Sequence, residues 1–95
     1  MAEKRVTVAI PTRNRFEMLR RAIGSVLCQS MEDFELIVID NASIDETQRI
    51  EEIFSDRRLS YHRNSSDIGI IENWNKAIRL ANCTYVNIFH DDDYM

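Results

Sequence analysis

Glycine, cysteine and proline are scarce in this 95-residue sequence, which has two glycines, two cysteines and one proline. With only Gly24 and Gly69, the chain cannot form a GxGxxG dinucleotide-binding turn, and it also lacks a GxxxxGK[ST] phosphate loop. Cys28 and Cys83 form no CxxC pair and have no histidine cluster beside them. We therefore expect two buried or half-buried free thiols rather than a disulfide framework or a zinc site.

Basic charge and long apolar runs are also lacking. The net charge of −4 argues against a nucleic-acid partner, because nucleic-acid-binding proteins normally present a basic face. No apolar stretch approaches the ~20 residues of a membrane span, and Met1–Arg5 does not begin a signal peptide. We therefore expect a cytoplasmic protein, with membrane association only through a longer parent protein. Hydrophobic residues at 44% and charged residues at 29% are ordinary for one globular domain.

The apolar periodicity predicts alternating strands and helices. The predicted strands are Val6–Ile10, Phe34–Ile39, Leu59–Arg63 and Thr84–Phe89, and the predicted helices are Phe16–Cys28, a helix within "DNASIDETQRIEEIF" (40–54), and Ile70–Ala81. The order β-α-β-α-β-α-β predicts an α/β fold in which helices sandwich a parallel sheet, like the first half of a doubly wound, Rossmann-like nucleotide-binding architecture.

The spacing also predicts how the helices begin and which residues they bury. We expect Asn14 to cap the first helix, and Ser43 or Asp45 to cap the second. The predicted buried residues are Ile50, Ile53 and Phe54 in the second helix, and Ile71, Trp74, Ala77, Ile78 and Ala81 in the third.

Polar segments follow all four predicted strands. They are "PTRNR" (11–15), "DNAS" (40–43), "NSSDIG" (64–69) and "HDDDYM" (90–95). Because the carboxyl ends of parallel strands share one edge, where ligands bind, we expect these segments to be neighbours in space. The exclusion of glycine-rich phosphate loops means that a ligand with phosphates needs another source of positive charge.

Three consecutive aspartates, Asp91–Asp93, suggest a metal ion as that source. Carboxylates packed so closely repel one another unless a cation lies among them, and Mg²⁺ or Mn²⁺ prefers such oxygen ligands together with substrate phosphates. The alternative is a solvated acidic turn. His90 either supports this site or is simply hydrogen-bonded.

Two further pairs of residues have alternative interpretations. Asp40 and Asn41 can contact a nucleobase or ribose hydroxyls, or one of them can cap the following helix. Arg13 and Arg15 either approach a phosphate or a base, or they are exposed loop charges.

From Val6 to Met95 the sequence resembles the N-terminal half of family 2 glycosyltransferases with the GT-A fold. The resemblance rests on an ordered set of segments: a strand ending in Pro-Thr-x-Asn, a helix carrying "SVLCQS" before "FELIVID", an Asp-Asn-x-Ser-x-Asp-x-Thr turn, and a helix with "NKAI" before an apolar strand and the acidic cluster. The resemblance implies that residues 1–95 form a single unit, the N-terminal, nucleotide-sugar-binding part of a glycosyltransferase domain.

The resemblance also implies a function and a binding site. It implies that the protein transfers sugar, with inversion, from a nucleotide-diphosphate donor to a saccharide or lipid-linked acceptor, in polysaccharide biosynthesis, with Mn²⁺ or Mg²⁺ as cofactor. The residues implied to bind the nucleotide sugar are Pro11, Thr12, Arg13, Asp40, Asn41, Gly69 and Asp91. Asp92 and Asp93 are implied to bind the metal as a DxD-type motif, with its register open between Asp91-x-Asp93 and an Asp91–Asp92 pair. Asn41 stands where family members often carry an acidic residue, which leaves the base preference open.

The resemblance further implies that the chain is truncated. The acceptor site and the general base are expected beyond Met95, so we expect no transfer activity from the 95 residues alone. An uncovered sheet edge and apolar surface should favour self-association. Two alternatives are a nucleotidyltransferase-like fragment, which normally needs a glycine-rich loop, and a non-catalytic acidic metal-binding α/β module, which would need its acidic pair after the first strand.

Overall fold

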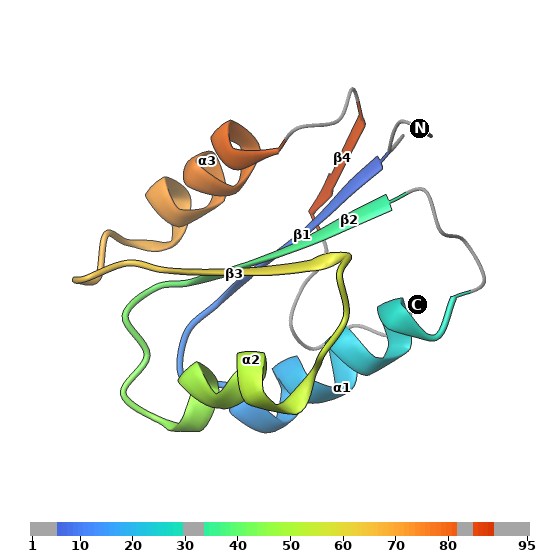
Figure 1. Ribbon diagram of the computed structural model, residues 1–95. Helices are drawn as coiled ribbons and strands as arrows, with labels where there is room; N and C mark the ends of the chain where they lie inside the picture. Colours follow the sequence, from blue (N-terminus) through green and yellow to red (C-terminus); the bar gives the residue numbers. More distant parts are fainter. Residues whose placement is uncertain (1–5, 30–33, 82–84, 89–95) are drawn as a thin grey trace.

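The computed structural model describes residues 6–29, 34–81 and 85–88 of the chain. The elements are β1 (Val6–Thr12), α1 (Phe16–Leu27), β2 (Phe34–Asp40), a 3₁₀ helix η1 (Glu46–Arg49) continued by α2 (Ile50–Ile53), β3 (Leu59–Arg63), α3 (Ile70–Leu80) and β4 (Tyr85–Ile88). The strands form one parallel sheet in the order β3-β2-β1-β4 (Figure 1). The predicted α/β fold with a parallel sheet between helices is confirmed.

Helices cover both faces of the sheet, with α1 and α2 on one side and α3 on the other (Figure 1). Alternate residues of β1 and β2 point to the two sides of the sheet. Because helices cover both sides, both strands are buried almost throughout. The larger core contains Val8, Ile10, Leu19, Ala22, Ile23, Val26, Phe34, Leu36, Val38 and Ile50. The smaller core contains Ala9, Ile37, Ile39 and Ala77. Burial on both faces explains why Val8–Ile10 and Leu36–Ile39 are continuously apolar.

One aspartate caps two helices on the same face of the sheet. The backbone N–H of Phe16, the first residue of α1, donates to Asp45 Oδ2 at 3.2 Å, and that of Thr47 in η1 donates to Asp45 Oδ1 at 3.0 Å. Partial burial acts to raise the pKa of Asp45, but the hydrogen bonds from Thr47 and Phe16 lower it below its usual value. The prediction of Asp45 as a cap is confirmed.

Asn14 does not cap α1, so that prediction is wrong. Asn14 has a positive φ of 53°, and its side-chain Oδ1 accepts a hydrogen bond from the N–H of Ile44 at 2.7 Å. Its own N–H donates to Ser43 Oγ at 2.8 Å. The side chain therefore joins the β1–α1 turn to the β2–η1 turn, and the cap of α1 comes from a residue about thirty positions away.

Helix α3 buries only part of the predicted face: burial of Ala77 is confirmed and Ala81 is half-buried, but the large apolar residues are exposed. Asn73 and Ala77 are 3% and 0% exposed, whereas Ile71, Trp74 and Ile78, which we predicted in the core, are 75%, 37% and 53% exposed. The amide of Asn73 reaches the sheet and donates to the carbonyl of Ile39 at 3.1 Å, which holds this face against β2. The prediction was wrong because it took the apolar side of the helix for the buried side. We call Ile71, Trp74 and Ile78 the α3 apolar stripe.

The second predicted helix is shorter and less buried than expected. It consists of the four residues of η1 followed by the four of α2. Ile50 is fully buried, but Ile53 is 40% exposed and Phe54 is only partly buried, so the predicted stripe holds for Ile50 alone. The reason is length, because two short turns present too little surface to bury three large side chains.

Cys28 is a free thiol, but it is exposed at the end of α1, so its predicted burial is wrong. Cys83 lies outside the described residues. None of the helices in the described ranges has the length and apolar character needed to cross a membrane.

Arg58 joins three parts of the chain before β3. Its guanidinium lies 4.8 Å from the ring centroid of Phe34 and donates to the carbonyl of Leu27 at 3.0 Å and to Asp56 Oδ2 at 2.8 Å. The hydrogen bonds from Arg58 lower the pKa of Asp56 from 3.8 to about 2. This carboxylate therefore stabilises the folded chain above pH ~4, and its contribution is lost as the pH falls through ~2.

Replacing Asp56 by asparagine should lower the free energy of unfolding by about 2 kcal/mol at pH 7, because a pKa difference of one unit corresponds to about 1.4 kcal/mol. The gap between the two proteins should close as the pH falls from 4 towards 2. Urea unfolding followed by circular dichroism at several pH values measures both effects. A gap that stays constant with pH would contradict the assignment.

Candidate functional site

Three strands end in register at one edge of the sheet. Thr12, Asp40 and Arg63, the last residues of β1, β2 and β3, are paired side by side. The ladder continues one step further, because the N–H of Asn41 donates to Thr12 O at 2.9 Å and that of Asn64 donates to Asp40 O at 2.8 Å. The segments that follow β1, β2 and β3 are therefore neighbours, as the topology predicts.

The fourth predicted segment is not described. Strand β4 ends at Ile88, which pairs with Ala9. His90 and the acidic cluster Asp91–Asp93 lie outside the described residues. Within the ranges that the structure does describe, no three metal-ligating side chains come together. The metal site therefore stays a prediction.

Asp40 is fully buried at this edge, and both of its carboxylate oxygens face protein groups. Oδ1 accepts from the N–H of Ser43 at 3.0 Å, and Oδ2 accepts from the hydroxyl of Tyr61 and lies 3.9 Å from Nε of Arg63. Burial and the bond to Asp40 together raise the pKa of Tyr61 above its usual value. The carboxylate thus supports the edge from inside, and direct contact between Asp40 and a ligand stays a prediction.

Asn41 is also buried, at 3% exposed, and it is the centre of a network of amides. Its Oδ1 accepts from Nδ2 of Asn64 at 3.0 Å and from the N–H of Ile68 at 2.9 Å. Nδ2 of Asn64 also donates to Oδ1 of Asn73 at 2.8 Å. The network fixes the β3–α3 loop against the end of β2. Buried hydrogen-bonded amides of this kind are costly to disturb, because an unpaired partner would remain.

Two charged side chains lie on the exposed side of this network. Arg13 and Asp67 have side chains that are 47% and 48% exposed, with 3.6 Å between Nε of Arg13 and Oδ2 of Asp67. Arg13 Nε also donates to the carbonyl of Asn41 at 3.1 Å. Asp67 Oδ1 accepts from Nδ2 of Asn41 at 2.7 Å and from the N–H of Gly69 at 2.9 Å. The bonds from Gly69 and Asn41 lower the pKa of Asp67 below its usual value.

The other predicted residues of this edge differ in accessibility. Thr12 is buried at 4% exposed, and Pro11 is half-buried within β1. Gly69 is exposed and has a φ of 87°, a conformation that glycine adopts far more readily than other residues. Arg15 is exposed immediately before α1. Of the predicted nucleotide-sugar-binding residues that the structure describes, Arg13 and Gly69 are the exposed ones.

Beside the network is an open hollow of about 320 Å³ with two cationic side chains. It is lined by Arg63, Asn64, Ser65, Ser66, Ile68 and Lys76. Nζ of Lys76 donates to Oδ1 of Asn64 at 2.5 Å, so the ammonium is held next to the amide network. Asn64, Asp67 and Lys76 were not singled out from the sequence, although "NSSDIG" was placed at this edge.

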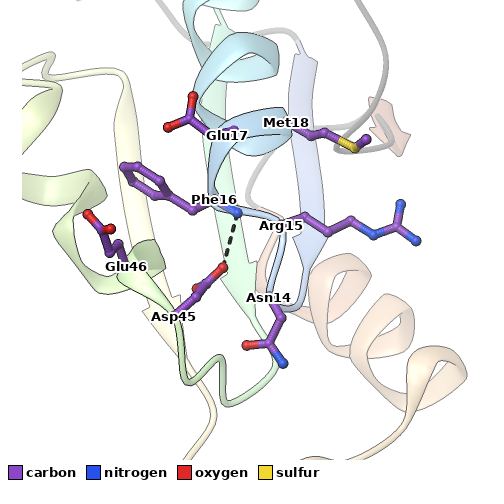
Figure 2. A pocket seen from close by; sticks show the side chains of 7 residues that line it. All are labelled: Asn14, Arg15, Phe16, Glu17, Met18, Asp45 and Glu46. Atoms are coloured by element: carbon purple, nitrogen blue, oxygen red, sulfur yellow. Dashed lines mark hydrogen bonds between the residues drawn. The ribbon is translucent and has the colours of Figure 1, made fainter.

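A second open hollow, of about 430 Å³, lies at the start of α1 (Figure 2). It is lined by Asn14, Arg15, Phe16, Glu17, Met18, Asp45 and Glu46. Figure 2 shows the Asp45 carboxylate bonded to the backbone nitrogen of Phe16. Because this carboxylate already caps two helices, we assign the candidate site to the edge around Arg13, Asn41 and Asp67 instead.

The sequence profile described as Glycosyl transferase family 2 matches residues 7–95. The chain belongs to this family. It is 33% identical over 90 residues to the putative colanic acid biosynthesis glycosyl transferase WcaA of Escherichia coli strain K12, covering 93% of this chain and 32% of that protein. The family predicted from the sequence motifs is confirmed.

Solved glycosyltransferase structures share the fold. S. aureus TarS 1-349 in complex with UDP-GlcNAc superposes with a TM-score of 0.86 at 26% identity, covering 95% of this chain and 27% of that chain. Mannosyltransferase PcManGT from Pyrobaculum calidifontis, in complex with GDP-Man and Mn²⁺, gives a TM-score of 0.82 at 28% identity, covering 97% and 28%. The predicted GT-A fold is confirmed, and the chain spans about a third or less of each of these relatives.

Proposed function

We propose that this chain forms the donor-binding part of a glycosyltransferase that transfers sugar, with inversion, from a nucleotide diphosphate to a saccharide or lipid-linked acceptor. One observation carries the proposal. The strands end in register at Thr12, Asp40 and Arg63, and hydrogen bonds join the loops after them into one polar edge. Ligands of open α/β sheets bind outside the carboxyl ends of the strands. The neighbours in complex with UDP-GlcNAc and with GDP-Man support a nucleotide sugar as the ligand.

The described residues would have two roles at this edge, contact with the nucleotide and support of the residues that make that contact. Arg13 and the backbone of Pro11, Thr12 and Gly69 would contact the nucleotide, while Asp40 and Asn41 would hold the edge in shape from below. Arg63 and Lys76 beside the network contribute positive charge, which favours an anionic ligand. No glycine-rich loop is needed when side chains and a cation neutralise the phosphates.

The chemistry of Asp91, Asp92 and Asp93 fits a hard divalent cation, because all three offer carboxylate oxygens. We assign metal binding to Asp92 and Asp93 and contact with the ribose, or with its bound water, to Asp91. When bound, Mn²⁺ or Mg²⁺ would bridge the protein to the diphosphate and neutralise its charge. The Mn²⁺ in the PcManGT complex supports a divalent cation as the cofactor.

Calorimetric titration with UDP, GDP and dTDP, each with and without Mn²⁺, tests the function. We expect at least one nucleotide to bind ~tenfold more tightly with Mn²⁺, because the ion offsets the repulsion between the diphosphate and the acidic cluster. The double variant Asp92→Ala/Asp93→Ala should lose this metal dependence.

A variant with Glu51→Ala and Glu52→Ala is the matched control, because it removes two exposed carboxylates from α2 instead. It should bind like the unmodified chain. Binding of Mn²⁺ without any effect of nucleotide would instead favour an acidic metal-binding module.

A further inference from the structure

We propose that Asp67 selects the nucleobase of the donor, by accepting a hydrogen bond from a ring N–H of the kind that uracil, thymine and guanine carry. The inference deepens the function proposed above and rests on it. Asp67 lies on the β3–α3 loop, outside the strand ends from which we predicted the binding residues.

The amide oxygen of Asn41 already accepts hydrogen bonds within the network, so it is not available to accept one from a base. Both lone pairs of Asn41 Oδ1 are occupied, by Nδ2 of Asn64 at 3.0 Å and by the N–H of Ile68 at 2.9 Å. Asp40 is fully buried and bonded to Ser43 and Tyr61. Neither β2 residue presents a carboxylate or amide oxygen to a ligand.

Asp67 presents such an oxygen at the same place. Its Oδ1 is held by Nδ2 of Asn41 and by the N–H of Gly69, while Oδ2 has Nε of Arg13 at 3.6 Å as its charged neighbour. The side chain is 48% exposed. Two bonds to one oxygen fix the direction of the other, so little side-chain entropy remains to be lost when a ligand binds.

The neighbouring guanidinium defines which base edge fits. A carboxylate oxygen beside Arg13 offers an acceptor next to donors, which complements a ring N–H next to a carbonyl. Uracil, thymine and guanine have this arrangement. When the ribose holds the base in the same register, cytosine and adenine place an unprotonated ring nitrogen there, whose lone pair would face the carboxylate. An unpaired polar contact of this kind is the usual source of strong discrimination.

The test is calorimetric titration, with Mn²⁺ present, of UDP, GDP, CDP and ADP into the 95-residue chain and into the Asp67→Asn variant. The unmodified chain should bind UDP or GDP at least ~tenfold more tightly than CDP and ADP. In the variant, the amide oxygen can keep the two bonds at Oδ1 and the amide nitrogen takes the place of Oδ2. Since a donor then replaces the acceptor, the preference should shrink by at least ~tenfold and shift towards CDP. A purely structural role would weaken all four nucleotides alike.

A second measurement does not depend on the folding of a variant. UDP and GDP methylated at the ring nitrogen, N3 and N1 respectively, should bind the unmodified chain at least ~tenfold more weakly than the parent nucleotides. Glu52→Gln, an equal change of charge at an exposed residue of α2, should leave the base preference as it is.

The outcomes separate the two proposals. If no nucleotide binds the unmodified chain, the proposed function fails and the inference fails with it. If UDP or GDP binds but methylation and Asp67→Asn leave the base preference unchanged, only the role of Asp67 is overturned.

Discussion

Replacing Asp40 by alanine should lower the free energy of unfolding by about 3–5 kcal/mol, the usual cost of removing one partner from a buried charged cluster. The change leaves the hydroxyl of Tyr61, the N–H of Ser43 and the guanidinium of Arg63 without their shared carboxylate. A 95-residue domain has a total stability of only about 5–14 kcal/mol, so a large part of it would be lost. Urea unfolding followed by circular dichroism measures the effect.

Two comparisons make this result specific. Tyr61→Phe removes one hydrogen-bond partner and should cost about 1–2 kcal/mol, and Glu52→Ala, at an exposed site, less than about 0.5 kcal/mol. A loss below about 1 kcal/mol for Asp40→Ala, accompanied by a large loss of nucleotide affinity, would show that Asp40 mainly contacts ligand.

Adjacent positions on α3 should be destabilised to very different extents by the same substitution. Ala77→Glu places a carboxylate in the apolar contact with Ala9, Ile37 and Ile39, where desolvation costs several kcal/mol, so we expect the chain to unfold. Ile78→Glu changes a side chain that is 53% exposed and should cost less than about 1 kcal/mol. Thermal unfolding of the two variants measures the contrast.

The Ile78→Glu variant also tests self-association. The sequence predicts self-association through an uncovered sheet edge and apolar surface, and the α3 apolar stripe is exposed apolar surface of this kind. The sedimentation coefficient of the unmodified chain should therefore rise with concentration, and Ile78→Glu should reduce that rise. Ile78→Glu destabilised as strongly as Ala77→Glu would show that the stripe is buried after all.

The order of elements and the parallel sheet were predictable because burial on two faces leaves a direct mark on the sequence. Val8–Ile10 and Leu36–Ile39 are continuously apolar, and only a strand covered on both sides needs that pattern. The end of β1 was less predictable. Pro11 suggested a stop after Ile10, yet Pro11 and Thr12 still pair with Ile39 and Asp40 in β2.

The position of the candidate site was predictable from topology, but its contacts were not. Parallel strands must bring their carboxyl ends together, so Arg13 and Asn41 were expected at one edge. The contacts made by Asn64, Asp67 and Asn73 depend on how the β3–α3 loop folds over β2, which no periodicity encodes. The α3 prediction failed for a related reason, since the amide of Asn73 and the small side chain of Ala77, rather than the apolar stripe, pack the helix on the sheet.

The joint between the β1–α1 and β2–η1 turns has a consequence for local opening. Asn14, Ser43 and Asp45 tie the two turns by three hydrogen bonds, so neither turn can detach without exposing backbone groups of the other. Segments linked in this way open as one cooperative unit. The amide protons of Asn14 and Phe16 and that of Ile44, about thirty residues further along the sequence, should therefore exchange with solvent at a common opening free energy.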